Sequence, residues 1–370
     1  MLKQQLARLG KGLFEEAIPG APQVDYTIAP NSAEEAAEVL RFASEHSLRV
    51  LFWGGGTHQA MGHWVDPDLV MTTSRLDQVV DWQPEDLTVV VQPGVLVADL
   101  EAQLEQQGQT AVLPETPGVA TVGGTIAAGL SGWRRLRYGP TRDRMLEVKL
   151  ATGDGRLIRG GGRLVKNVTG YDLPRLATGS LGSLGLITEV CLKLWPLRAE
   201  RAMLHVDDPE RALQAAYRPD ALIETNDSTT LYLAGSAEEI AAQAEHVGGD
   251  LAPGHRWPEP LAGRTEIALR VPASAVTVFS AMLRTREVAF QAAHGTGEVR
   301  FLADGIVDEI AAIRRSAESM GGALVVVRAG ADSSIDPWGT PPGSVELQSR
   351  VKDAFDPVGV ANPGILPGGI

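Results

Sequence analysis

Apolar residues recur at two characteristic spacings along the first 115 residues. Ser32 and Glu35 have the spacing of a helix capping box, and Ala36, Val39 and Leu40 follow at helical intervals. Short apolar runs predict buried strands at 48–53, 68–73, 87–92 and 110–113, and a second helix is predicted over 97–107. Such alternation of helices and strands is typical of an α/β unit.

The pattern then changes twice. A helix of small residues is predicted over 122–130, a β-hairpin around Gly153-Asp154-Gly155 and a strand over 186–194. Residues 197–300 are rich in Ala, Glu and Arg, with helices predicted over 208–217, 236–246 and 273–285, so we expect a second mixed domain. A loop over 332–345, a helix over 344–355 and a Pro/Gly tail follow. We expect segments 1–196, 197–340 and 341–370.

Glycine is the compositional feature that changes this picture. The chain has 41 glycines in 370 residues, and 15 of them lie in the 68 positions from 118 to 185. The average share is about 7%. Because an ordered glycine costs backbone entropy, such a concentration predicts that backbone comes close to something.

Three glycine-dense loops stand at predicted strand or helix ends: Gly54-Gly55-Gly56-Thr57, Pro117–Thr125 and Gly179–Thr188. Each is either a tight turn or a cradle whose backbone N–H groups bind an anion. Neither a P-loop motif nor a dinucleotide-binding G-x-G-x-x-G occurs in the required context. Together the three loops favour one long ligand with a diphosphate and flat rings over three unrelated turns.

Charge and cysteine content exclude several classes of protein. The formal net charge is −13, which makes nucleic acid an unfavourable partner. No apolar run is long enough to predict a transmembrane segment, and the N-terminal residues lack the apolar core of a secretory signal. Cys191 is the single cysteine, which excludes an internal disulfide and a cysteine-based metal site. We expect a cytoplasmic location.

Several motifs in this order carry a resemblance to a known family. They are Gly54–Thr57, Thr121-Val122-Gly123-Gly124, Lys166-Asn167-Val168-Thr169-Gly170-Tyr171-Asp172-Leu173, Gly179–Thr188 and Phe355–Gly364. Together they resemble the FAD-binding proteins of the vanillyl-alcohol oxidase / p-cresol methylhydroxylase type. Residues 131–196 are most similar to the E-type flavoprotein subunits of bacterial glycolate oxidases. The implied fold is α+β: a FAD-binding domain of two α/β subdomains, a C-terminal α+β cap domain, and a tail that returns to the flavin domain.

The resemblance also implies a cofactor site. The residues expected to contact FAD are Gly54, Gly55, Gly56, Thr57, Pro117, Gly118, Thr121, Gly123, Gly124, Gly182, Gly185, Ile187 and Asn362. Some relatives bind FAD covalently through a histidine at the position of Thr57, so we expect non-covalent FAD, with His58 one residue later. Many relatives carry a glutamate where this chain has Leu181, so one polar contact to FAD is expected to be missing.

The resemblance leaves the catalytic residues unassigned. Catalytic 2-hydroxyacid relatives hold a metal with several histidines and a glutamate, whereas this chain offers only His294, so no metal site is predicted. The implied function is that of a FAD-binding subunit of a glycolate oxidase complex that converts glycolate to glyoxylate. Its partners would be a homologous flavoprotein subunit, the expected seat of oxidation, and an iron–sulfur subunit, with peripheral contact to a membrane through the complex as one option.

Two alternatives stay open. One is a stand-alone FAD-dependent 2-hydroxyacid dehydrogenase, and the other is a scaffold subunit that keeps the flavin fold for assembly only. We expect the intact glycines to argue against the scaffold, because a site without a ligand would have no need of them.

An arginine cluster has several interpretations. Arg134, Arg135, Arg137, Arg142 and Arg144 are close in sequence in an otherwise acidic chain. They could clamp a substrate carboxylate, contact a FAD phosphate, dock a partner, or form a solvated face paired with local acids. Docking is the functional interpretation that the neighbouring motifs favour.

Overall fold

The computed structural model describes residues 4, 6, 9, 14–15, 18–163, 170–252, 254–330 and 333–370. The chain divides into two compact units. Unit 1 comprises Met1–Leu130, Pro140–Pro196 and Thr340–Ile370, and unit 2 comprises Ser131–Gly139 and Leu197–Gly339. Unit borders therefore lie close to the expected boundaries at 196 and 340, but residues 131–139, which we expected in the first segment, cluster with unit 2.

The first sheet of unit 1 has the strand order β1-β2-β4-β3. Its strands are β1 (Phe14–Glu15), β2 (Thr27–Ile28), β3 (Val50–Trp53) and β4 (Leu69–Thr72). β4 pairs in parallel with β2 and with β3, so β3 and β4 end at the same edge. Helix α2 (Ala33–Glu45) starts at Ser32, whose side chain accepts a hydrogen bond from Glu35 N, and packs its apolar face into the same core.

The second sheet of unit 1 is antiparallel, with the order β5-β6-β10-β8-β9. Its strands are β5 (Val79–Gln83), β6 (Thr88–Val91), β8 (Met145–Thr152), β9 (Leu157–Gly161) and β10 (Gly185–Lys193). Around it lie α3 (Val97–Glu105), α4 (Val122–Ala127), α6 (Leu173–Ala177), the 3-10 turn η1 (Thr141–Asp143) and the short pair β7 (Gln109–Thr110) and β11 (Trp195–Pro196). The apolar sides of α3 and α4 share one core with β6, β8 and β10.

The C-terminal segment belongs to unit 1. After helix α11 (Val345–Phe355) the chain runs back to the first sheet, where Ala361 forms a parallel bridge with Val50 at the free edge of β3. Val50 N also donates to Val360 O, and Asn362 N donates to Val50 O. The expected return of the tail to the flavin domain is confirmed, and it extends the edge from which the first glycine loop departs.

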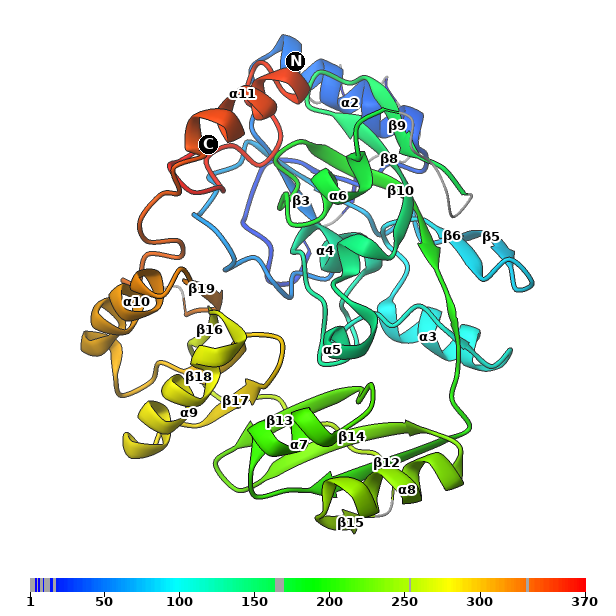
Figure 1. Ribbon diagram of the computed structural model, residues 1–370. Helices are drawn as coiled ribbons and strands as arrows, with labels where there is room; N and C mark the ends of the chain where they lie inside the picture. The colour runs from blue at the N-terminus through cyan, green and yellow to red at the C-terminus, as the bar shows by residue number, and fades with distance from the viewer. Residues whose placement is uncertain are drawn as a thin grey trace. The chain divides into compact units, whose positions relative to one another are not determined.

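Unit 2 is built on one eight-stranded antiparallel sheet, ordered β15-β12-β14-β13-β17-β18-β16-β19. Its strands are β12 (Glu200–His205), β13 (Ala221–Thr225), β14 (Thr229–Gly235), β15 (Asp250–Ala252), β16 (Glu266–Arg270), β17 (Phe290–Ala293), β18 (Glu298–Leu302) and β19 (Ala323–Arg328). Its helices are α5 (Arg135–Tyr138), α7 (Pro209–Ala215), α8 (Ala237–Val247), α9 (Val276–Thr285) and α10 (Ile310–Ser319), with 3-10 turns η2 (Ala273–Ala275) and η3 (Val307–Glu309). Helices α7 to α10 pack on one face of this sheet (Figure 1).

Elements with clear periodicity or turn residues were predicted well. The structure confirms α2, α3, the hairpin of β8 and β9, and the helices α8 and α11 within a few residues. The interpretation of residues 1–115 as one α/β unit is too simple, because β5 and β6 leave the parallel sheet and join the antiparallel one. Within the motif that starts at Lys166, residues 166–169 lie outside the described part of the chain. Among the described residues, no helix combines the length and the apolar character needed to cross a bilayer.

Candidate functional site

The first glycine loop leaves β3 with its backbone donors unused. Within the described chain, no protein acceptor is found for the N–H groups of Gly54, Gly55 and Gly56. Gly56 has a φ of +69°, a conformation that L-residues rarely adopt, and its Cα faces the Trp53 indole. Successive free N–H groups at a strand end form a concave anion site. Of the two interpretations of this loop, a tight turn or an anion-binding cradle, the geometry fits the cradle.

The second glycine loop packs tightly against the first. Thr121 caps α4, its Oγ1 accepting from Gly124 N at 3.2 Å, and Gly123 N donates to Pro93 O at 2.9 Å. A Cβ on Gly54 would lie 2.3 Å from Thr121 Oγ1. Because α4 has only six residues, its dipole is small, so we assign anion binding to the amides of the first loop rather than to this helix.

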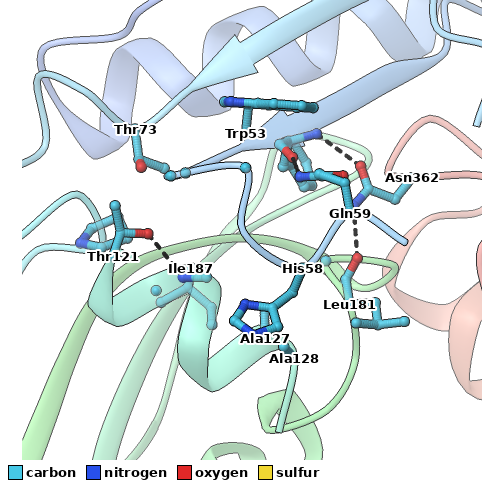
Figure 2. Close-up of a pocket in the computed structure, with 18 of the residues that line it drawn as sticks. Trp53, His58, Gln59, Thr73, Thr121, Ala127, Ala128, Leu181, Ile187 and Asn362 are labelled. Atoms are coloured by element: carbon cyan, nitrogen blue, oxygen red, sulfur yellow. Dashed lines mark hydrogen bonds between the residues drawn. The ribbon is translucent and has the colours of Figure 1, made fainter. Parts of the chain in front are cut away.

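The third glycine loop is held in an unusual conformation by the C-terminal segment. Leu181 has a φ of +50° and Gly182 one of +74°. Asn362 Nδ2 donates to Leu181 O at 2.6 Å, and Asn362 Oδ1 accepts from Phe52 N at 2.8 Å. The Asn362 side chain therefore ties the third loop to β3, and Figure 2 shows both bonds.

A buried charged pair supports this arrangement from behind. Lys352 Nζ donates to Ser183 O at 2.6 Å, to Ala361 O at 2.6 Å and to Asp356 Oδ2 at 2.5 Å. Asp356 in turn accepts from the N–H groups of Val360 and Ala361, each at 2.8 Å. Burial lowers the pKa of Lys352, while the neighbouring Asp356 carboxylate opposes that change. The pair fixes the third loop and the returning tail to α11.

The three loops enclose one cavity. The empty space that it encloses is about 730 Å³, the solvent at its mouth included. Eleven of the expected residues line it, namely Gly54, Gly55, Gly56, Thr57, Thr121, Gly123, Gly124, Gly182, Gly185, Ile187 and Asn362. Pro117 and Gly118 are not among its lining residues, and Gly118 is exposed with open space around it. The Leu181 side chain also lines the cavity.

Several lining residues were missed by the sequence reasoning, among them Trp53, Gln59 and Thr73 (Figure 2). Thr73 directly follows β4, and β4 ends beside β3 because the two strands are parallel. Ligands gather at the carboxyl ends of parallel strands. The predicted strand at 68–73 therefore carried a usable signal for Thr73.

One argument from the sequence is wrong. Gly55 and Gly123 are required by the protein's own packing, whether or not a ligand binds. A Cβ on Gly55 would lie 1.8 Å from Val119 O, and one on Gly123 would lie 2.4 Å from Pro93 Cβ. Their presence therefore does not argue against a scaffold. Gly124 differs, because its Cβ would meet only Thr121 Oγ1 within 4 Å, at 3.0 Å, and otherwise open space.

The remaining candidate residues lie elsewhere. His294 is buried in unit 2, with its Nε2 2.7 Å from Glu224 Oε2, and Glu224 also pairs with Arg284 at 2.8 Å. Burial opposes ionisation of Glu224, but hydrogen bonds from His294 and Ser280 hold its pKa below the usual value. Among the described residues, no group of three or more His, Cys, Asp or Glu is placed to hold a metal ion.

The five arginines near 134–144 are divided between the two units. Arg134, Arg135 and Arg137 belong to unit 2, and Arg142 and Arg144 belong to unit 1. Arg137 forms a buried ion pair with Asp220 at 2.9 Å. Arg144 is buried and donates to Val112 O at 2.7 Å and to Thr141 Oγ1 at 2.6 Å. At least these two side chains are structural.

Comparison with known proteins gives this geometry a context. The profile of the FAD binding domain family matches residues 24–161. Glycolate oxidase subunit GlcE of Escherichia coli is 30% identical over 300 residues, which cover 77% of this chain and 83% of GlcE. This chain belongs to the FAD-binding family that includes GlcE.

Other matches of the FAD-binding family agree with the fold. Glycolate oxidase subunit GlcD of Bacillus subtilis is 37% identical over 176 residues, 46% of this chain and 37% of GlcD. The chain thus spans well under half the length of that relative. A solved structure of alkyldihydroxyacetonephosphate synthase superposes with a TM-score of 0.66 at 15% identity, over 92% of this chain and 76% of that chain, which shows the α+β fold.

FAD is the cofactor of this family, and the residues of the cavity fit it. The hydroxyl of Thr73 is buried, lines the cavity and has no hydrogen-bond partner in the described chain. Since buried polar groups are normally satisfied, Thr73 Oγ1 is suited to a ligand atom. The free amides of Gly54–Gly56 and the open face of Gly124 meet the needs of a diphosphate and a close-packed flat group.

Thr73→Val tests this fit. The change removes one hydroxyl and keeps the shape, so we expect FAD affinity to fall about tenfold. The stability of the apoprotein should stay the same or rise, because an unpaired buried hydroxyl is removed. FAD titration and urea unfolding of the apoprotein measure the two effects. Thr277→Val, at an exposed position on α9 in unit 2, is the matched control; equal FAD affinity of the two variants would contradict the assignment.

Proposed function

We propose that this chain is the FAD-binding subunit of a glycolate oxidase complex, which oxidises glycolate to glyoxylate and passes electrons to an iron–sulfur subunit. The observation that carries the proposal is the cavity formed by three glycine loops in a chain that matches 83% of GlcE. The partners would be a homologous flavoprotein subunit, in line with the similarity to GlcD, and the iron–sulfur subunit.

The chain's own residues would hold and orient the cofactor. Bound FAD supplies a two-electron acceptor for the hydroxy acid, and the protein supplies position and electrostatics. The amides of Gly54–Gly56 would bind the diphosphate, and Thr73 would donate or accept one hydrogen bond. Asn362 would keep the third loop close by its bonds to Leu181 O and Phe52 N. Attachment would be non-covalent, because Thr57 stands at the position where some relatives carry the histidine that bonds to the flavin.

The flavin content of the purified chain is the first test. We expect about one FAD per chain, all released into the supernatant by acid precipitation. Glycolate should not be turned over by the single chain, whereas co-expression with the two partner subunits should restore activity. Absence of flavin even after incubation with excess FAD, or flavin that remains with the precipitate, would contradict the cofactor proposal. Glycolate turnover by the single chain would instead favour the stand-alone dehydrogenase.

One observation removes an argument against the scaffold alternative. Since Gly55 and Gly123 are needed for packing, they would be retained even without FAD. The unpaired hydroxyl of Thr73 and the open face of Gly124 favour a bound cofactor, since packing alone explains neither. A complex that keeps full activity after Thr73 and Gly124 are changed so that FAD no longer binds would establish the scaffold.

A further inference from the structure

Trp53 is the last residue of β3, and it lines the cavity directly before the first glycine loop. The residue is only 5% exposed, although its side chain carries a polar N–H group. Trp53 O accepts from Thr73 N at 3.0 Å, so the two residues lie side by side at the carboxyl ends of β3 and β4 (Figure 2). Two residues with a polar side-chain group therefore stand at this edge of the cavity.

The indole N–H of Trp53 is not used by the protein. Trp53 Nε1 has no hydrogen-bond acceptor among the described residues, and unlike Thr73 Oγ1 it is not closed off from solvent. Because Trp53 lines the cavity and is otherwise covered, the accessible part of its ring faces the cavity. A buried indole N–H normally has an acceptor, so this N–H is suited to an acceptor atom of a ligand.

The edge of the Trp53 ring lies against the first glycine loop. A Cβ built on Gly56 would lie 2.6 Å from Trp53 Cζ2 and 3.2 Å from Trp53 Nε1. The ring thus occupies the place of a side chain at position 56, and its N–H is next to the free amides of Gly54–Gly56. An indole nitrogen can only donate, as a backbone amide does. Neighbouring donors of this kind match a ligand group with several acceptor oxygens, which is the chemistry of a phosphate.

The described lining of the cavity contains no lysine or arginine side chain. It contains no carboxylate either, and His58 is the one titratable side chain in this part of the lining. His58 Nδ1 lies 2.8 Å from Thr57 Oγ1. A diphosphate in this cavity would therefore be bound mainly by uncharged N–H and O–H groups, and each of these donors would contribute a large share of the affinity.

We propose that the indole N–H of Trp53 donates a hydrogen bond to a diphosphate oxygen of FAD, as one of a set of uncharged donors that take the place of basic side chains. A hydrogen bond to a charged acceptor is about twice as strong as one between neutral groups. The amides of Gly54–Gly56 belong to the backbone, whereas Trp53 supplies a donor that substitution can remove. The inference rests on the FAD-binding part of the proposed function and is independent of the substrate.

FAD titration of the full-length apoprotein tests this donor. Trp53→Phe removes the N–H together with one ring, and benzothienylalanine incorporated at position 53 keeps both fused rings with sulfur in place of the N–H. We expect each change to weaken FAD binding about tenfold, because a hydrogen bond to a charged group is lost. Trp82→Phe is the matched control, since Trp82 Nε1 donates to Gln109 Oε1 at 3.1 Å outside the cavity lining. It should unfold at a lower urea concentration but keep the FAD affinity of the parent chain.

The indole N–H resonances provide a readout in the unsubstituted protein. The chain has seven tryptophans, so isotope labelling of tryptophan gives few indole signals, and the signal that disappears in Trp53→Phe is that of Trp53. FAD should shift this signal downfield and slow its exchange with solvent. ADP has the diphosphate without the flavin ring and should shift it in the same direction, while the Trp82 signal should stay in place.

Salt dependence tests the absence of basic side chains. Salt screens the attraction between a phosphate and a lysine or arginine, and it also screens the repulsion of FAD by a chain of net charge −13. FAD affinity should therefore not fall when sodium chloride is raised from about 0.05 to about 0.5 M. A fall of tenfold or more would show that basic side chains hold the diphosphate, and it would overturn the set of uncharged donors.

The remaining outcomes separate this inference from the proposed function. A parent chain that does not bind FAD would contradict both. A parent chain that binds FAD, while the benzothienylalanine chain binds it equally well, would overturn the role of Trp53 alone. The same holds if the Trp53 signal does not move when FAD and ADP bind. A tenfold loss of affinity together with the downfield shift would establish the hydrogen bond.

Discussion

Lys352→Met is expected to destabilise the protein by about 3–5 kcal/mol, because removing one member of a buried ion pair leaves the other charge uncompensated. Lys352 and Asp356 are 5% and 1% exposed. The substitution also removes donors from Ser183 O and Ala361 O, the two carbonyls that connect α11 to the third loop and the tail. FAD affinity should therefore fall together with stability. Urea unfolding and FAD titration measure the two losses.

A surface ion pair provides the comparison. Arg256 and Glu259 form an ion pair with side chains 78% and 72% exposed, so Arg256→Met should cost under about 1 kcal/mol. Lys352→Gln keeps polar donors without the charge and should fall between these two variants. A loss below about 1 kcal/mol for Lys352→Met would show that the buried pair is not what holds the tail in place.

The fold and the glycine loops were accessible from the sequence because their signals are local. The Ser32 cap fixes the start of α2, the turn residues around Asp154 fix the hairpin of β8 and β9, and the three loops contain their glycines in short stretches. The family resemblance added the return of the tail, which no local pattern could give, since Ala361 and Val50 are far apart in the chain. Local chemistry thus predicted elements, and resemblance predicted their association.

The parts that were missed depend on contacts between distant residues. Thr73 looks like an ordinary strand end until β3 is placed beside β4. Lys352 lies in an amphipathic helix, and its sequence pattern predicts a surface position. In the structure its ammonium group is buried and donates to Ser183 O. Arg270 and Glu298 are neighbours only because β16 pairs with β18 in an antiparallel register. Single-sequence patterns cannot rank such pairs, because the strand order of an eight-stranded sheet is set by packing.

Glycine content alone did not show which glycines are needed for a ligand. A glycine can be required by the ligand or by the rest of the protein, and composition does not distinguish the two cases. Gly55 and Gly185 would each place a Cβ within 2.2 Å or less of a backbone carbonyl oxygen, at Val119 and Ala151. No backbone atom of the described chain lies within 4 Å of a Cβ built on Gly124, apart from its own helix and its chain neighbours, although Gly124 lines the same cavity. A substitution at Gly124 therefore tests FAD binding, whereas a substitution at Gly55 or Gly185 tests the stability of the fold.

Gly124→Leu is expected to abolish FAD binding, with an affinity loss of at least about a hundredfold, while the apoprotein keeps its stability to within about 1 kcal/mol. A larger side chain at Gly124 has open space in the protein once Thr121 Oγ1 shifts slightly, and that space is the cavity. Leucine is also a better helix former than glycine, which offsets the close contact. Fluorescence titration with FAD and urea unfolding of the apoprotein measure the two quantities.

Gly55→Ala is the opposing case. Its Cβ would lie 1.8 Å from Val119 O, a backbone atom that cannot move without the loop, so the apoprotein should lose about 1–3 kcal/mol or more. Gly343→Leu, at an exposed glycine with nothing within 4 Å of its Cβ and outside the cavity lining, should change neither quantity. If Gly124→Leu retained one FAD per chain, the cofactor could not occupy the space in front of α4, and the assignment of this cavity would have to be withdrawn. If instead it lost FAD while Gly55→Ala lost stability, the two uses of glycine would be separated within a single site.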